Sequence, residues 1–424
     1  MPRYVIDEAA LTRNLEILAS VRERAGVKIL LAQKAFSCFK LYPLVAKYLD
    51  GATASGLFEA RLAHEEMPGK ENHVFAPAFR AEDMPELLAI VNHIVFNSPR
   101  QVEKFGEMAR AAGVSVGLRV NPEVSVATTP AYDPCRPGSR LGVTRGELDA
   151  AWGGAQFTST DDSDAMNCVP PVTRRLNASM SQRLNCLDGL HFHCLCEQGV
   201  EELRKVLAGF EAKFGDLLPR MKWVNFGGGH HITRADYDMD GLVELLLDFR
   251  RRYPHLTVYL EPGEAVALNA GTLEATVLEI QPPGADGVAN AILDVSAACH
   301  MPDVLEMPYT PRVTGTDANC VPPADCPTSD AACRTSHVAC PPSNHVYRFG
   351  GPTCLAGDVI GTYSFPRPLA EGDRVVFEDM AIYSMVKNNT FNGMPLPSIA
   401  VRCVDGTVET LKAFGYADFK GRLG

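Results

Sequence analysis

Along the first 265 residues, the hydrophobic positions alternate between two patterns. Segments with apolar residues three and four positions apart predict amphipathic helices, such as the stripe Leu11, Leu15, Leu18 and Val21 after a capping Asp7. Between the helices stand eight short segments that fit strands, at 28–33, 51–55, 72–76, 93–97, 114–121, 186–193, 222–227 and 256–263. Strands that alternate with helices pair in parallel, so the pattern predicts a TIM-like (β/α)8 barrel, with a doubly wound open sheet as the competing interpretation.

After about residue 265 the pattern changes. Short strand-like runs are separated by Gly, Pro and Asp, and no long helical period appears, which predicts an all-β C-terminal domain. We therefore expect a barrel domain at 1–265 and a β domain at 266–424. Two polar, turn-rich stretches fit neither domain and are interpreted as insertions, at 153–184 and 314–345. The second insertion contains four cysteines, Cys320, Cys326, Cys333 and Cys340.

Charge and composition narrow the possible partners and the compartment. The 424 residues carry 40 Lys and Arg against 51 Asp and Glu, a formal charge of −11, which argues against nucleic acid and anionic membranes as main partners. No apolar run approaches the roughly 18 residues that span a bilayer. Asp7 and Glu8 stand where a signal peptide would be apolar. We therefore interpret the 13 cysteines mainly as reduced thiols of a cytoplasmic protein.

Polar residues and glycines that could take part in catalysis or ligand binding follow four of the predicted barrel strands. Lys34 ends the first, the pair His191 and His193 ends the sixth, three glycines (227–229) end the seventh, and Glu261 ends the eighth. The carboxyl ends of barrel strands carry the active sites of such enzymes, so these residues are expected at one rim. A desolvated lysine there forms Schiff bases, and bare glycine amides admit a phosphate.

Each of these signals is weak alone, and each has an ordinary structural interpretation. Lysines in loops are usually solvated, a triple glycine is often only a turn, and a strand-end acid often forms a salt bridge. Cys194 and Cys196 beside the two histidines suggest zinc, but the spacing is not that of a zinc site, so we predict no metal. In the β domain, Cys354 and Tyr383 have no special meaning by themselves.

The combination of motifs resembles the fold type III pyridoxal-phosphate decarboxylases, which include ornithine, arginine and diaminopimelate decarboxylases. The resemblance covers nearly the whole chain apart from the two insertions. Within the family, the motifs are most similar to the branch that acts on carboxynorspermidine and carboxyspermidine. The motifs that carry it are KILLAQKAF, GLHFHCLCEQ, NFGGGHH, EPGEAVALNAG, SAACHMPDVLEMPY, GGPTCLAGD and FEDMAIYSMVKNNTFNG. The resemblance implies an alanine racemase-like barrel, an all-β domain and a homodimer with shared active sites.

By that resemblance, residues from both domains would serve pyridoxal 5'-phosphate. Lys34 would bind it covalently, His193 would stack on its ring, and Glu261 would pair with its ring nitrogen. Its phosphate would be held by the backbone of the glycine run, Gly227, Gly228 and Gly229, and by the Tyr383 side chain. Cys354 of the partner subunit would protonate the carbon that loses CO2.

Departures from the wider family point to the substrate. Glu264 stands where the family often has the arginine of EPGR, CLCE replaces the usual HxGS, and Leu355 replaces an acid. Glu264 and Asp303 would suit the amine end of a cationic polyamine amino acid, which is the small-molecule partner that we predict. Two alternatives remain: decarboxylation of diaminopimelate or another basic amino acid, and an inactive, binding-only homologue.

Overall fold

The computed structural model describes residues 1–127, 129–153, 180, 183–314, 319–320 and 345–424. These residues divide into two compact units. One is Asn14–Val266, and the other combines Met1–Arg13 with Ala267–Gly424. The sequence predicts residues 1–265 as one domain, but the first thirteen belong with the C-terminal unit because they supply a strand to its sheet.

Within the described residues, eight parallel strands close into a barrel in chain order. They are β2 (Lys28–Ala32), β3 (Gly51–Ala54), β4 (Glu71–Phe75), β5 (His93–Phe96), β6 (Ser115–Arg119), β7 (Gly189–His191), β8 (Trp223–Asn225) and β9 (Thr257–Leu260). The ring is complete because β9 pairs with β2, with Lys28 opposite Tyr259. The predicted (β/α)8 barrel is confirmed, and the doubly wound sheet is wrong because such a sheet keeps two free edges.

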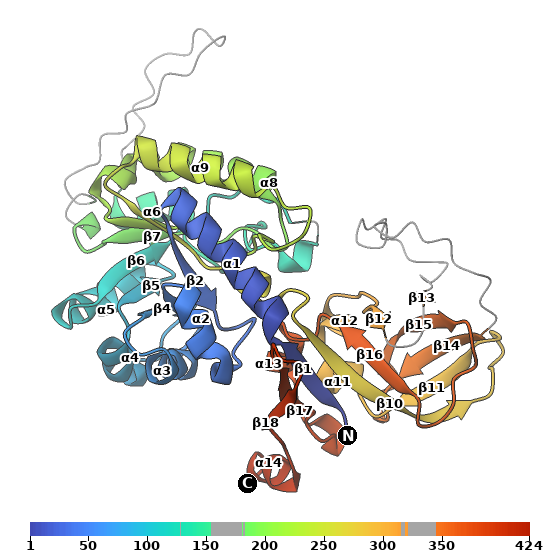
Figure 1. Cartoon of the computed structure of the whole chain (residues 1–424). Coiled ribbons are helices and arrows are strands. Elements are labelled where there is room, and N and C mark those ends of the chain that lie inside the picture. The colour runs from blue at the N-terminus through green and yellow to red at the C-terminus, as the bar shows by residue number, and fades with distance from the viewer. Residues whose placement is uncertain (128, 154–179, 181–182, 315–318, 321–344) are drawn as a thin grey trace. The chain divides into compact units, whose positions relative to one another are not determined.

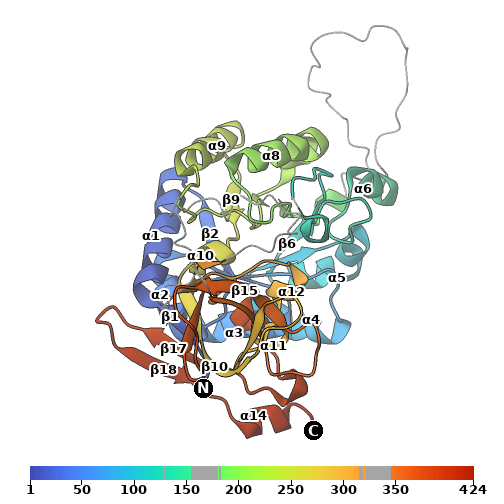
Figure 2. The same ribbon diagram turned by 90° about the vertical axis from the view of Figure 1, so that its right-hand side faces the viewer.

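Helices connect the strands and lie outside the barrel (Figures 1 and 2). They are α1 (Glu8–Ala25), α2 (Tyr42–Tyr48), α3 (Leu57–Glu66), α4 (Met84–Ile90), α5 (Pro99–Ala111), α6 (Arg145–Trp152), α8 (Val200–Phe214), α9 (Met239–Arg252) and the short α10 (Glu264–Ala267). Capping residues set where they begin. The Asp7 carboxylate accepts a hydrogen bond from the Ala10 amide at 2.7 Å, and Ser98 caps α5.

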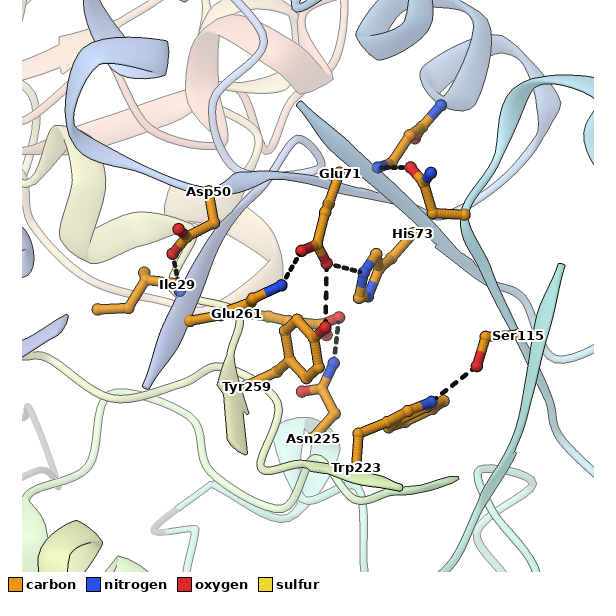
Figure 3. A network of polar contacts seen from close by, with 12 residues as sticks. Ile29, Asp50, Glu71, His73, Ser115, Trp223, Asn225, Tyr259 and Glu261 are labelled. Carbon is orange, nitrogen blue, oxygen red and sulfur yellow. Dashed lines mark hydrogen bonds and ion pairs between the residues drawn. The ribbon is translucent and has the colours of Figure 1, made fainter. Parts of the chain in front are cut away.

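The amino-terminal end of the barrel holds a polar and aromatic network (Figure 3). The Glu71 carboxylate is paired with Lys28, accepts a hydrogen bond from the Tyr259 hydroxyl at 3.0 Å and lies 3.0 Å from His73 Nε2. The rings of His73 and His93 stack, with their centroids 3.9 Å apart. One ligand atom each of Glu71, His73 and His93 lies within 4.8 Å of the other two, but the Glu71 carboxylate is already paired with Lys28 and Tyr259, so we assign this network to stability, the usual role of this end of a barrel.

The second unit is built around a twisted sheet, in which ten of the described strands take part. The strand β1 (Arg3–Asp7) lies between β10, which runs antiparallel to it, and β17, which runs parallel. The other strands are β10 (Gly271–Gln281), β11 (Ala289–Leu293), β12 (Val313–Thr314), β13 (Asn319–Cys320), β14 (His345–Gly350), β15 (Val359–Phe365), β16 (Arg374–Glu378), β17 (Ser398–Arg402) and β18 (Val408–Lys412). Short helices accompany them: α11 (Ala297–His300), α12 (Asp303–Glu306), α13 (Ser384–Lys387) and α14 (Tyr416–Gly421).

Most of both predicted insertions, 153–184 and 314–345, lies outside the described residues, and so do Cys326, Cys333 and Cys340. Eight cysteines in the described part are free thiols, among them Cys194, Cys196 and Cys354. No helix among the described residues has the length and apolar character needed to cross a bilayer.

Candidate active site

Lys34 lies two residues beyond β2, at the carboxyl edge of the barrel. Its turn is fixed by hydrogen bonds from the Gln33 amide to Thr53 O (3.2 Å) and from the Ala35 amide to Ala32 O (3.1 Å). The side chain is exposed to solvent, but enough protein surrounds it that desolvation lowers its pKa. The nearby positive charge of Arg119 lowers the pKa further, against the opposing effect of Glu261. The lysine is therefore biased toward the neutral, nucleophilic amine.

Glu261 directly follows β9, and its side chain is only 11% exposed. One carboxylate oxygen accepts a hydrogen bond from Asn225 Nδ2 at 2.7 Å (Figure 3), and the other lies 3.2 Å from His191 Nε2. Burial opposes the negative charge, but these hydrogen bonds lower the pKa of Glu261 to about 2. Burial lowers the pKa of His191, so we take His191 as the neutral donor of the pair. A carboxylate accepts more than two hydrogen bonds, so Glu261 can still take one from a ligand.

The glycine run packs against both Glu261 and His193. A side-chain carbon on Gly228 would lie 2.2 Å from the Glu261 carbonyl oxygen, and Gly227 has a φ of +70°. The Gly228 amide donates to His193 Nδ1 at 2.8 Å. Burial lowers the pKa of His193 well below its ordinary value, which leaves Nδ1 unprotonated and able to accept. Direct contacts thus join Glu261 to His191 and the glycine run to His193, while Lys34 is near enough to Glu261 for the carboxylate to affect its pKa.

Arg119 is a member of this site that the sequence analysis missed. It ends β6, is 4% exposed, and donates from Nη2 to the His193 carbonyl at 3.1 Å. Its guanidinium carbon lies 4.5 Å from the centre of the Phe75 ring. The signal was available, because a charged residue ends an apolar strand in VSVGLRVN just as Lys34 does in KILLAQK.

Cys194 does not suit a metal site. It is 1% exposed, and burial raises the pKa of its thiol well above the ordinary value. Zinc binds cysteine as the thiolate, so the environment of Cys194 disfavours the zinc alternative.

In the C-terminal unit, three of the quoted motifs come together. Asp358 accepts hydrogen bonds from the Ser296 hydroxyl (2.9 Å) and the Thr353 hydroxyl (2.6 Å). The amide of the exposed Cys354 donates to Asn392 Oδ1 at 2.7 Å. These bonds fix the GPTC turn against the SAAC and FNG motifs, so the Cys354 thiol stands on a well-supported turn.

The same unit places Tyr383 and Asp303 near one lysine. Lys387 Nζ lies 2.5 Å from an Asp303 oxygen, 2.6 Å from a Glu306 oxygen and 5.9 Å from the centre of the Tyr383 ring. Tyr383 has a φ of +36°, which is rare for a non-glycine residue and marks a constrained position. In the barrel unit, Glu264 lies 3.1 Å from His231 Nε2. Both acids proposed for the substrate therefore already have a basic neighbour.

Comparison with known proteins identifies the family. The family described as pyridoxal-dependent decarboxylase, C-terminal sheet domain, matches residues 3–381. Carboxyaminopropylagmatine decarboxylase of Synechocystis is 40% identical, with 100% of this chain and 95% of the relative covered. Carboxynorspermidine/carboxyspermidine decarboxylase of Campylobacter jejuni is 38% identical, with 99% and 98% covered. The crystal structure of carboxynorspermidine decarboxylase from Campylobacter jejuni, complexed with norspermidine, has a TM-score of 0.80 at 37% identity, with 100% and 99% covered.

This chain belongs to the pyridoxal-dependent decarboxylase family. The predicted enzyme class and cofactor are thereby confirmed. Its residues also fit pyridoxal phosphate on their own chemistry: Lys34 offers an amine of lowered pKa, Glu261 a buried carboxylate, and Gly228 a surface with no room for a side chain.

Proposed function

We propose that this chain removes CO2 from a carboxylated polyamine, carboxynorspermidine or carboxyspermidine, to give norspermidine or spermidine. The observation that carries the proposal is the similarity at 38% identity, over nearly the full length, to an enzyme named for these two substrates. The acid Glu264 in the EPGE motif supports it, because a carboxylate suits a cationic substrate.

The residues divide the chemistry among themselves. Pyridoxal phosphate, when bound, supplies a cationic ring that accepts the electron pair released as CO2 leaves. Lys34 would hold the cofactor, Glu261 would keep a proton on its ring nitrogen, and neutral His193 would pack on the ring without repelling its charge. Tyr383 and the three glycines, Gly227, Gly228 and Gly229, remain the proposed phosphate contacts, with the amides of Gly227 and Gly228 shared with Asn225 Oδ1 and His193 Nδ1. The Cys354 thiol would return a proton to the carbon.

The distal cation of the substrate is assigned to Glu264 and Asp303. In the structure, one Glu264 oxygen contacts His231 and one Asp303 oxygen contacts Lys387. A carboxylate can accept on its second oxygen as well, so these contacts do not exclude the substrate. They do imply that the substrate cation shares each acid with a basic side chain of the protein.

A second candidate is carboxyaminopropylagmatine, which is favoured by the relative at 40% identity. Agmatine ends in a guanidinium where the polyamines end in an ammonium. A carboxylate binds either group, but guanidinium binds in a bidentate, planar geometry. Diaminopimelate, whose distal end also carries a carboxylate, fits two acidic contacts less well.

The proposal includes a homodimer with shared sites and a cytoplasmic location, as expected from the sequence. An inactive, binding-only homologue is disfavoured, because Lys34, Glu261 and Cys354 are all present.

Steady-state kinetics on four substrates test the function: carboxynorspermidine, carboxyspermidine, carboxyaminopropylagmatine and diaminopimelate. We expect the highest kcat/KM for a carboxylated polyamine. The two polyamine acids differ by one methylene, which a pocket discriminates by about 1–3 kcal/mol, or roughly 10- to 200-fold. The highest value for diaminopimelate would overturn the proposal, and the highest value for carboxyaminopropylagmatine would replace it by the second candidate.

A further inference from the structure

His231 has an arrangement that the functions assigned so far do not explain. It lies in the loop after β8, two residues beyond the glycine run, and is 7% exposed. Its Nε2 is 3.1 Å from Glu264, which begins α10 just after β9. Both ring nitrogens are buried: Nδ1 has no hydrogen-bond partner among the described residues, and Nε2 has only the ion-pair contact with Glu264. The side chain thus joins the loops after the seventh and eighth barrel strands and leaves one polar atom unused.

The position of the imidazole is fixed by the backbone around it. The His231 amide donates to Gln198 O at 3.2 Å, and the Gln198 amide donates to Gly229 O at 2.9 Å. The Thr233 hydroxyl donates to Ala265 O at 2.6 Å, which ties the loop to α10. Because the loop is held on both sides of His231, the unused atom is a stable feature of the site.

Charges around His231 favour its protonated form. Burial alone would lower the pKa of His231, but the hydrogen bond and charge of Glu264, together with the charge of Glu197, raise it above the ordinary value, and Arg234 opposes them. Arg234 is itself paired with Asp236. The neighbouring His230 differs, because burial lowers its pKa to about 4 and leaves it neutral.

An imidazolium carries an N–H on both nitrogens. The Nε2–H faces Glu264, so the buried Nδ1–H needs another acceptor, and a buried donor without one is costly. The amides of Gly227 and Gly228 already donate to Asn225 Oδ1 and His193 Nδ1, at 2.8 Å each. A phosphate at this loop therefore needs a further donor. Barrel enzymes frequently place a phosphate at the loops after strands seven and eight, the two loops that His231 joins.

We propose that His231 is a cofactor-binding residue, whose imidazolium donates its Nδ1–H to the phosphate of pyridoxal phosphate, while Glu264 holds it in position and protonated. Without that proton, Glu264 would present an uncompensated negative charge to the phosphate. This role is separate from the proposed contact between Glu264 and the substrate, and it holds for any substrate.

The test compares the dissociation constants of pyridoxal phosphate and of pyridoxal, which lacks the phosphate, by absorbance titration of the cofactor-free full-length protein. The dissociation constant of pyridoxal divided by that of pyridoxal phosphate isolates the contribution of the phosphate. Both compounds condense with Lys34 in the same way, so the free energy of that step cancels from the ratio. Loss of one charged hydrogen bond in His231→Gln should reduce this ratio about 10- to 100-fold. Arg234→Gln is the matched control, since it removes a more exposed cation from the same loop, and it should change the ratio less than threefold.

The pH dependence provides a second measurement that needs no His231 variant. A group of raised pKa is protonated at low pH and loses its proton as the pH rises, so the wild-type ratio should fall above neutral pH. The phosphate stays dianionic there, because its second pKa is about 6. Glu264→Gln should move this decrease in the ratio to lower pH, because it removes the negative charge that raises the pKa of His231. An equal ratio in wild type and His231→Gln, or a wild-type ratio that does not vary above pH 7, would show that His231 only fastens the loop. Effects of Glu264→Gln on the substrate are read separately, from KM at saturating cofactor.

Discussion

Replacing Gly228 by alanine tests the packing on which the active site depends. The added carbon would lie 2.2 Å from the Glu261 carbonyl oxygen and 3.6 Å from His193 Cε1. The first distance is far inside van der Waals contact, and the obstacle is backbone, which cannot rotate away. The loop after β8 must therefore move away from the end of β9.

The expected cost has two parts. Forcing an extra carbon into a packed site typically destabilises a protein by about 1–3 kcal/mol. Displacing Glu261 and His193 by about 1 Å from their positions should also reduce kcat/KM about 100-fold. Chemical denaturation measures the first effect, and cofactor absorbance with steady-state kinetics measures the second.

Gly146→Ala is the control, because Gly146 lies in α6 with open space around a side-chain carbon. Alanine there should leave activity unchanged and stabilise the chain by about 0.5–1 kcal/mol. If Gly228→Ala matched wild type in stability, cofactor absorbance and kcat/KM, the described contact between the glycine run and Glu261 would be incorrect.

Three further substitutions test single groups. Lys34→Ala should fold normally but lose the visible absorbance of the bound cofactor and at least about 1,000-fold of the activity; a retained band would contradict the assignment. Glu261→Gln should lower kcat/KM about 10- to 100-fold. The pKa of Glu261 is lowered from 4.5 to about 2, so its charge stabilises the fold above pH 4.5, and this contribution is lost as the pH falls toward 2. Wild type should therefore lose more stability than Glu261→Gln over that range. Identical acid denaturation curves for the two proteins would contradict this expectation. Cys354→Ala, at an exposed position, should lower kcat at least about tenfold with unchanged thermal stability, and full activity would remove Cys354 from the proposed mechanism.

The barrel was predictable because its signals are local. Each strand is a short apolar run, and the predicted stripe of Leu11, Leu15, Leu18 and Val21 lies buried on the observed helix α1 (Glu8–Ala25). Closure in chain order then places every strand end at one edge, which is why Lys34, His193 and Glu261 were identified together. Arg119 carries the same signal, because it is a charged residue at the end of the apolar run VSVGL.

Other features depend on contacts between distant segments. The strand β1 pairs with residues about 270 and 395 positions later in the chain, and nothing in RYVID predicts that choice. Likewise, the sequence does not show that Asp303 and Glu264 have basic neighbours. Only the fold brings Lys387 and His231 beside them.

The central claim is that this chain decarboxylates a carboxylated polyamine and then protonates the carbon. Incubating the cofactor-loaded protein with carboxynorspermidine in D2O, followed by mass spectrometry of the product, tests both steps in one measurement. We predict norspermidine that carries one non-exchangeable deuterium. Recovery of the unchanged substrate, from protein that shows the visible band of the bound cofactor, would contradict the account.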